Sequence, residues 1–222
     1  MSIDPYSENG VLKNKFGETN PKKLDILEKR YTARGWVKIH NELLATPNLK
    51  LDAALLKKIH KALFEDVYEW AGEYRTVNIV KGNTMFANAL YVPAALDDLF
   101  TKLNREITAK SITSNNVSEK LAYYYGELNM IHPFREGNGR TQKIFIQRTA
   151  AKLGYYLDLE KADPKKLLEA TIESVNGTGK PLKEIFEEVT INRNLDGITD
   201  KSESIKENVK ELRRNNDFDL ER

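Results

Sequence analysis

Nine consecutive residues carry most of the candidate chemistry in this chain. The segment His132-Pro-Phe-Arg-Glu-Gly-Asn-Gly-Arg140 combines an imidazole, a carboxylate, two glycines around an asparagine, and two guanidinium groups. Apolar residues at helical spacing precede the segment and follow it. A residue before proline is disfavoured in the α region, so the preceding helix should end near His132 and leave the imidazole at a helix end.

The second half of the segment predicts an anion site. Gly137 and Gly139 let the backbone approach a ligand closely. The next helix should run from about residue 138 or 140 to Leu153, and the free N–H groups and dipole of its first turn attract an anion. Arg140 adds a planar fork that suits phosphate oxygens.

Glu136 predicts a cation in the same place, because its carboxylate would otherwise repel a phosphate. One carboxylate together with phosphate oxygens and waters is a usual way to hold Mg²⁺. His132 is then placed as a general base beside a Mg²⁺–nucleotide. The alternative is a helix–loop–helix corner whose glycines are caps and whose histidine is a satisfied buried group.

Composition narrows the class of protein. A chain of 222 residues with 40% hydrophobic content can form one domain with a real core. Zero cysteines exclude disulfides, thiolate metal sites and cysteine nucleophiles, and fit a reducing compartment. A net charge of +2 does not indicate the basic surface with which proteins bind nucleic acid, so no nucleic-acid partner is expected. No apolar run is long enough for a bilayer, and the first residues do not resemble a signal peptide, so we expect a cytosolic protein with no membrane partner.

Apolar residues recur at helical spacing along most of the chain. His40 and His60 lie in two of these stretches and are expected to be packing residues. Asp52 is expected to cap one helix, Gly72 to end it, and Ser118 to cap the helix that leads into the nonapeptide. Residues 1–20 are expected to have little regular structure, and the charged residues 194–222 to form a helical tail or linker. The loop Asn176–Pro181 fails the spacing of a phosphate loop and is expected to be an ordinary connection. The expected helices cover 21–44, 52–71, 95–108, 118–132, 138–153, 164–175 and 182–191.

The only credible hairpin lies at residues 76–87. Residues 76–80 are rich in β-branched side chains, Lys81-Gly82-Asn83 is turn chemistry, and 84–86 can return as a second strand. A packed surface loop is one interpretation. The other is an exposed strand edge that pairs with an extended segment of another protein.

The nonapeptide resembles the signature of the Fic (filamentation induced by cAMP) family, His-Pro-Phe-x-Asp/Glu-Gly-Asn-Gly-Arg, at every position. Asp4-Pro-Tyr6, Asn14-Lys-Phe-Gly17, the stretch 59–75 with Trp70-Ala-Gly72, and the hairpin are also similar to a Fic core. The likeness covers about residues 4–191 and is greatest to the branch of Bartonella effectors and FicT toxins. It implies an all-α Fic fold, a helical bundle with one short β-hairpin flap, in a domain over 1–193.

The resemblance also implies an activity, the transfer of AMP from ATP to a Ser, Thr or Tyr hydroxyl of a target protein with release of pyrophosphate. ATP is the substrate and Mg²⁺ the cofactor. By position, the signature supplies a general base (His132), a core anchor (Phe134), a Mg²⁺ ligand (Glu136), a phosphate cradle (Gly137, Asn138 with its side chain, and Gly139) and a clamp on the far phosphates (Arg140). The target is expected to dock on the flap residues Ile79, Val80, Lys81, Gly82, Asn83, Thr84, Met85 and Phe86.

Two other functions stay open. The Doc-type branch transfers the γ-phosphate as a protein kinase but has lysine where Gly139 stands here, so glycine favours AMP transfer. A catalytically idle docking module is the second alternative, although it would have no need of an intact base, metal ligand and phosphate clamp.

Regulation is expected to come from outside the chain. Many family members carry a self-inhibiting helix, Ser/Thr-x-x-x-Glu-Gly/Asn, whose glutamate pairs with the arginine matching Arg140. Glu8-Asn9 has Asp4 in place of the required Ser/Thr, and Glu207-Asn208 has Glu203 there. The resemblance therefore implies a small antitoxin partner that supplies an inhibitory glutamate. The expected location is the bacterial cytoplasm, with delivery into a host cell cytosol as the effector alternative.

Overall fold

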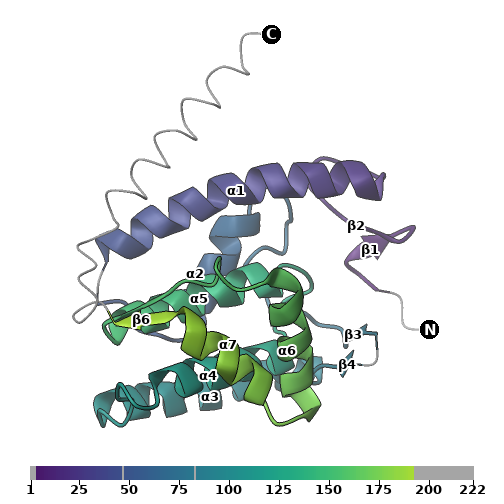
Figure 1. Cartoon of the computed structure of the whole chain (residues 1–222). Coiled ribbons are helices and arrows are strands. Elements are labelled where there is room, and N and C mark those ends of the chain that lie inside the picture. The colour runs from purple at the N-terminus through teal and green to yellow at the C-terminus, as the bar shows by residue number, and fades with distance from the viewer. Residues whose placement is uncertain (1–3, 47, 83, 193–222) are drawn as a thin grey trace.

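The computed structural model describes residues 4–46, 48–82 and 84–192 as a predominantly helical fold (Figure 1). The tail expected at 194–222 lies outside the described residues. All seven expected helices are present. Their bounds are α1 (Pro21–Ala45), α2 (Ala53–Phe64), α3 (Val92–Thr108), α4 (Val117–Ile131), α5 (Asn138–Lys152), α6 (Pro164–Asn176) and α7 (Lys180–Val189), and a 3₁₀ turn, η1 (Ala89–Tyr91), precedes α3.

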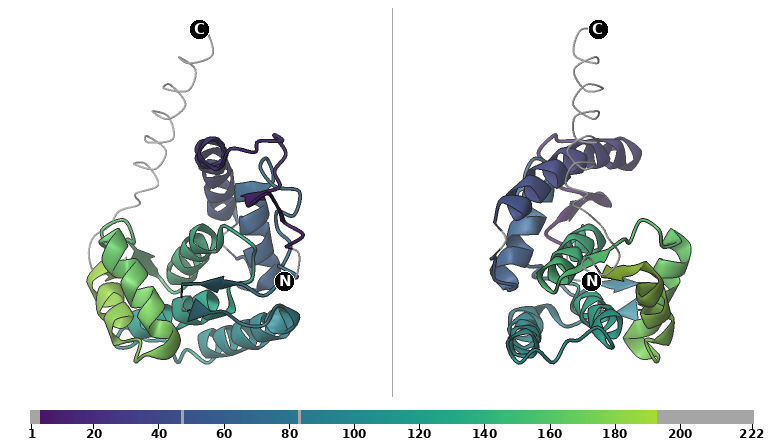
Figure 2. Two further views of the ribbon diagram at one scale, coloured as in Figure 1. Left: turned by 90° about the vertical axis from the view of Figure 1, so that its right-hand side faces the viewer. Right: turned by 60° about the vertical axis from the view of Figure 1, so that its left-hand side comes forward.

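The helices on either side of the signature, α4 and α5, pack against each other at the centre of the bundle. Helix α2 lies on α5, and the long α1 lies across α2 on one side of the molecule. Helices α3, α6 and α7 pack against α4, with α6 and α7 paired on the side away from α1 (Figures 1 and 2). The expectation of an all-α bundle is confirmed. No described helix is long and apolar enough to cross a membrane.

Within the described ranges, three short antiparallel ladders accompany the helices. The expected flap is present as β3 (Val80–Lys81) and β4 (Thr84–Met85). The expectation that it is the only hairpin is wrong, because β1 (Ser7–Glu8) pairs with β2 (Val11–Leu12) inside the supposedly irregular lead-in. Asn9 and Gly10 join them with φ of 50° and 81°, the left-handed pair that favours a tight hairpin. A third ladder joins β5 (Tyr155–Leu157) to β6 (Thr190–Asn192).

Helix α2 shows where periodicity misleads. Asp52 caps it as expected, with its Oδ1 accepting from the Leu55 N–H at 3.0 Å. The helix ends at Phe64, however, and not at residue 71. Val67, Tyr68 and Ala71 are buried in the irregular segment after the helix and extend the apolar pattern past the helix end. The assignment of Gly72 as a helix C-cap is therefore wrong.

Several other helix ends differ from expectation. Helix α3 begins at Val92 and not at residue 95, and α7 begins at Lys180 and not at residue 182. Helix α4 begins at Val117, so Asn116 and not Ser118 is at its N-cap. Helix α7 ends at Val189, because Thr190 and Ile191 enter β6, where β-branched side chains are favoured.

The loop between α6 and α7 is an ordinary connection, as expected. The Glu173 carboxylate accepts the N–H of Thr178 at 2.8 Å and the N–H of Gly179 at 3.1 Å. An internal carboxylate thus takes the loop amides that a phosphate would need.

Candidate active site

The signature loop begins where α4 ends, one residue before Pro133. Helix α4 stops at Ile131, as the position of the proline predicts. His132 then adopts φ 48° and ψ 61°, a left-handed conformation and not the extended one usual before proline. Left-handed backbone is unfavourable for a residue with a side chain, so surrounding contacts must hold it.

The His132 ring is oriented on two sides. Its Nδ1 lies 3.2 Å from the carbonyl oxygen of Asn129, a contact that requires Nδ1 to carry the proton. The ring also stacks on Phe86 of the flap, with centroids 3.8 Å apart. With Nδ1 engaged, the lone pair of Nε2 is left to accept a proton, which is the geometry of a general base.

The electrostatic surroundings keep His132 neutral. Burial, and after it the Lys81 ammonium, lower the pKa of the imidazole to about 4, against the opposing effects of the Asn129 carbonyl and Glu136. The side chain is 7% exposed. At neutral pH the ring is therefore in the form that can take a proton.

Gly137 turns the chain into α5 and has no room for a side chain. Its φ of +79° is left-handed, and a Cβ there would lie 2.2 Å from the Phe64 ring. At Gly139, in contrast, a Cβ would meet nothing within 4 Å. The first-turn N–H groups of α5 have no helical acceptor and lie at the positive end of the helix dipole, so this end of α5 is suited to an anion.

Asn138 closes the loop from within. Its Oδ1 accepts from the Phe134 N–H at 2.8 Å, and its Nδ2 donates to the Phe134 carbonyl at 2.7 Å. Both polar groups of the amide are thus used inside the loop. The role of the Asn138 side chain and of the backbone of residues 137–139 in a phosphate cradle stays a prediction, and in this structure the side-chain amide is engaged with Phe134. Phe134 is fully buried, as a core anchor should be.

His60 packs as expected, but it also supports the signature loop. Its Nδ1 accepts from the Gly72 N–H at 2.8 Å, which leaves Nε2–H to donate to the Glu136 carbonyl at 3.0 Å. The ring stacks on Phe134 with centroids 3.8 Å apart. Burial lowers the pKa of His60 to about 3, so the ring is neutral. His40, the other packing histidine, stacks on Trp36.

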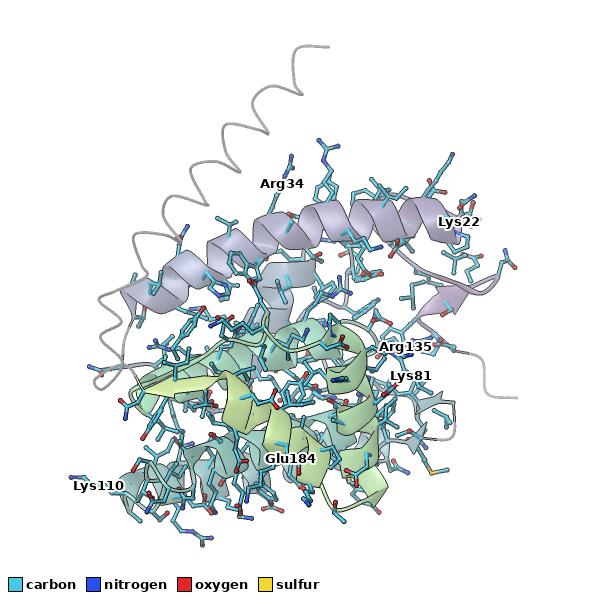
Figure 3. The ribbon with its side chains drawn as sticks, viewed as in Figure 1. Lys22, Arg34, Lys81, Lys110, Arg135 and Glu184 are labelled. Carbon is cyan, nitrogen blue, oxygen red and sulfur yellow. The ribbon has the colours of Figure 1, made fainter. Side chains whose placement is uncertain are left out.

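Glu136 lies where the signature loop meets the flap. Its Oε1 accepts from the Gly137 N–H at 2.9 Å, and its Oε2 lies 4.0 Å from Nζ of Lys81. In Figure 3 Lys81 and Arg135 lie on the same side of the molecule, one on the flap and one in the signature loop. Among the described residues no group of three or more acidic or histidine side chains could hold a metal. A single carboxylate is nevertheless enough for Mg²⁺ when phosphates and waters complete the shell.

Arg140 has a partner that sequence analysis missed. Its Nη2 lies 2.6 Å from Oε1 of Glu28 on α1, and its guanidinium stands over the Phe64 ring at 4.7 Å. The Tyr68 hydroxyl donates to the other Glu28 oxygen. Glu28 is buried and follows buried Leu24 by one helical turn, so a carboxylate on the apolar face of α1 was the available signal. Glu8, in β1, is not on a helix.

The N-terminal segment reaches both parts of the site. Arg135 in the signature loop forms an ion pair with Asp4 at 2.7 Å. The Tyr6 hydroxyl accepts from the Thr76 N–H at 3.0 Å at the start of the flap segment. The residues that resemble a Fic lead-in are therefore a brace for the loop and the flap.

The flap exposes one set of side chains and buries the other. Val80, Lys81, Gly82 and Met85 are exposed, Ile79 is half-buried, and Thr84 and Phe86 are buried. Asn83 lies outside the described residues. The flap thus brings Lys81 and Phe86 to the signature loop while Val80 and Met85 face outward.

Comparison with known proteins identifies the family. The Fic/DOC family model matches residues 50–150. Protein adenylyltransferase VbhT of Bartonella schoenbuchensis is 36% identical over 88% of this chain and 41% of that protein. The probable protein adenylyltransferase y4lH of Sinorhizobium fredii is 38% identical over 62% of this chain and 72% of that protein.

A solved structure gives the same result. It is that of BepC, a VirB-translocated Bartonella effector protein from Bartonella tribocorum, with bound AMPPNP. It is 26% identical, has a TM-score of 0.73, and the match covers 84% of this chain and 96% of that one. The chain spans less than half the length of VbhT. With the signature complete at residues 132–140, this chain belongs to the Fic/DOC family.

Proposed function

We propose that this chain is a protein adenylyltransferase that moves AMP from ATP to a Ser, Thr or Tyr hydroxyl of a target protein. The observation that carries the proposal is the neutral, buried His132, with its proton on Nδ1, in one loop with the open N-terminus of α5. The names of the similar VbhT and y4lH, and the AMPPNP bound to the similar BepC, support the same activity.

In the proposed mechanism the phosphates of ATP lie over the first-turn N–H groups of α5. Nε2 of His132 takes the proton of the target hydroxyl as its oxygen attacks the α-phosphorus, and pyrophosphate leaves. Arg140 holds the far phosphates. Glu136 would hold Mg²⁺, which neutralises phosphate charge when bound. Positioning and charge neutralisation supply most of the rate enhancement in such reactions.

Isotopic labelling tests the proposal against both alternatives. The purified chain is incubated with Mg²⁺, a bacterial lysate, and ATP labelled at either the α- or the γ-phosphate. AMP transfer puts label on protein from the α-position only. Label from the γ-position alone would identify the Doc-like kinase activity, and label from neither would identify a docking module. We expect the first result, because position 139 holds glycine and not the lysine of the Doc-type branch. The space that a lysine side chain would occupy is open here.

Glu136 is expected to act through the metal. Glu136→Gln keeps the side-chain volume and the bond from the Gly137 N–H but removes the negative charge. We expect it to lower the rate and to weaken Mg²⁺–ATP binding roughly 10- to 100-fold, in line with an ion contact of about 1.5–3 kcal/mol. Calorimetric titration with and without Mg²⁺ measures this. If ATP affinity without Mg²⁺ falls equally, Glu136 does not act through the ion.

We propose that the flap selects the target. The exposed Val80 and Met85 are paired across the ladder and face outward, so they can contact a target segment that pairs with the hairpin. Replacing both by Ser should change which lysate proteins are labelled while self-labelling stays within about twofold, because neither side chain enters the signature loop. An unchanged labelling pattern on a gel would place target selection elsewhere.

We also propose that a small antitoxin partner inhibits the chain by placing a glutamate against Arg140. A groove of about 420 Å³ lies beside Arg140 and is bounded by Lys29, Trp36 and Leu63. Because Glu28 already pairs with Arg140, the incoming carboxylate would share or displace that contact. The proposed place of action is the bacterial cytoplasm, with a host cell cytosol as the alternative for a delivered effector.

Expression of the chain alone in bacteria tests for an external inhibitor. We expect the wild type to slow growth. The His132→Ala variant should be tolerated, because it lacks the base, and it serves as the control because its inhibitor groove is unchanged. Equal growth of the two, with a purified wild type that does not label lysate, would place the inhibition within the chain. Glu28→Gln would then be expected to release it.

A further inference from the structure

Arg75 is a fully buried arginine that no step of the proposed mechanism uses. Its side chain is 2% exposed and lies between the flap segment and the end of α4. Its guanidinium donates to four backbone carbonyl oxygens, which belong to two separate segments of the chain. A buried guanidinium is costly unless it is well hydrogen-bonded, so this arrangement indicates a specific task.

One set of bonds surrounds the proposed base. Nε donates to the His132 carbonyl at 2.8 Å, and Nη2 donates to the Ile131 carbonyl at 3.2 Å. The backbone N–H of Arg75 donates to the Pro133 carbonyl at 2.9 Å. One residue thus binds three consecutive carbonyls centred on His132. The Ile131 and His132 carbonyls belong to the two peptide groups whose orientation sets the left-handed backbone of His132.

The other set of bonds reaches both ends of the flap. Nη1 donates to the Val77 carbonyl at 2.7 Å, before β3, and Nη2 also donates to the Ala87 carbonyl, after β4. The Ala87 N–H in turn donates to the Met130 carbonyl at 3.1 Å on α4. The two ends of the hairpin are therefore tied to each other and to the helix that carries His132.

We propose that Arg75 is a positioning residue that holds His132 and the base of the flap in one fixed relation. The inference rests on the AMP transfer proposed above. A target hydroxyl docked on the flap can lose its proton to His132 only if the flap and the imidazole keep their spacing. A rigid planar fork with several N–H groups can bind carbonyls on both sides at once, whereas a lysine ammonium is a point donor on a flexible stem.

The test compares Arg75→Lys, Arg75→Gln and a control, Arg148→Gln. Arg148 on α5 also donates to a backbone carbonyl, that of Thr46 at 2.9 Å, but outside the site. For each protein we measure the melting temperature, the dissociation constant of Mg²⁺–ATP by calorimetry, and the maximal rate of self-labelling from α-labelled ATP. Hydrogen exchange reports the protection of the flap segment 77–87.

We expect the maximal rate to fall roughly 30- to 100-fold in Arg75→Gln, and less in Arg75→Lys, as a misplacement of about 1 Å at a reacting group costs on this order. Mg²⁺–ATP affinity should stay within about twofold, because Arg75 does not contact the α5 N–H groups. Flap amides should exchange faster in both variants. The control should match the wild type in rate and flap exchange.

Other results would overturn the inference. A retained rate with a loosened flap would make Arg75 merely structural, and parallel losses of rate and ATP affinity would do the same. If Arg75→Gln does not fold, Arg75→Lys decides, since it keeps the charge. If the wild type itself transfers no label, the proposed function fails. In that case the Arg75 variants are still compared with the wild type by hydrogen exchange of the flap and by the NMR signal of the His132 ring. A change in both would show that Arg75 couples the flap to His132, and a change in only one would contradict it.

Discussion

Replacing His132 by alanine will lower the rate of AMP transfer roughly 10²- to 10⁴-fold, the usual contribution of a general base. The affinity for Mg²⁺–ATP should change little, because the imidazole acts on the target hydroxyl and not on the nucleotide. Its Nδ1 is bonded to Asn129 and its ring stacks on Phe86, so the free edge is Nε2. Calorimetry and single-turnover labelling separate the two quantities.

The pH dependence supplies an independent check on His132. Because the pKa of the imidazole is lowered from 6.5 to about 4, kcat/KM should be flat at neutral pH and should fall as the pH drops through about 4. An acid limb near 6.5 would contradict the burial of the base. So would a loss of ATP affinity in His132→Ala as large as the loss of rate. Circular dichroism at each pH excludes acid unfolding as the cause.

Replacing Gly137 by alanine will have the largest effect on stability. The added Cβ would lie 2.2 Å from the Phe64 ring at a φ of +79°. We expect a loss of roughly 2–5 kcal/mol, since left-handed backbone costs about 1–2 kcal/mol for a residue with a side chain and overpacking a core costs about 1–3 kcal/mol. Urea denaturation of the ligand-free protein measures it.

Gly139→Ala is the matched control two residues away. Its Cβ would meet nothing within 4 Å, and it lies in the first turn of α5. Stability should stay the same or rise slightly, while the methyl group narrows the proposed phosphate site and weakens ATP binding. Equal destabilisation by the two substitutions would show that Gly137 is not packed as described. Unchanged ATP affinity in Gly139→Ala would move the phosphates away from it.

Local chemistry was sufficient to predict the helices and the place of the signature loop. Pro133 predicted the end of α4, and the helix start predicted at residue 138 or 140 agrees with α5, which begins at Asn138. The sequence also marks the first hairpin, because Asn9-Gly10 is a strong turn signal. The end of α2 is not marked, since buried residues after the helix such as Val67 and Tyr68 continue its apolar pattern.

The contacts that orient the side chains and the loop of the site could not be predicted from local sequence. Arg140 and Glu28 are 112 residues apart, and His60 is 76 residues from Glu136. Arg75 binds carbonyl groups, which every residue has, so no pairing of side-chain types marks it in the sequence. Sequence patterns identify which groups can react. The bonds that orient those groups depend on how distant segments pack.

The contacts of the N-terminal segment with the signature loop and the flap determine how short an active fragment of this fold can be. The family model spans residues 50–150, which hold His132, Glu136 and Arg140. A piece cut to that span would lack Asp4, Tyr6 and Glu28. Arg135, the flap base at Thr76 and the guanidinium of Arg140 would each lose a partner. The span that carries the reacting groups is therefore shorter than the span that holds them in place, and α1 and the segment that leads into β1 belong to the site.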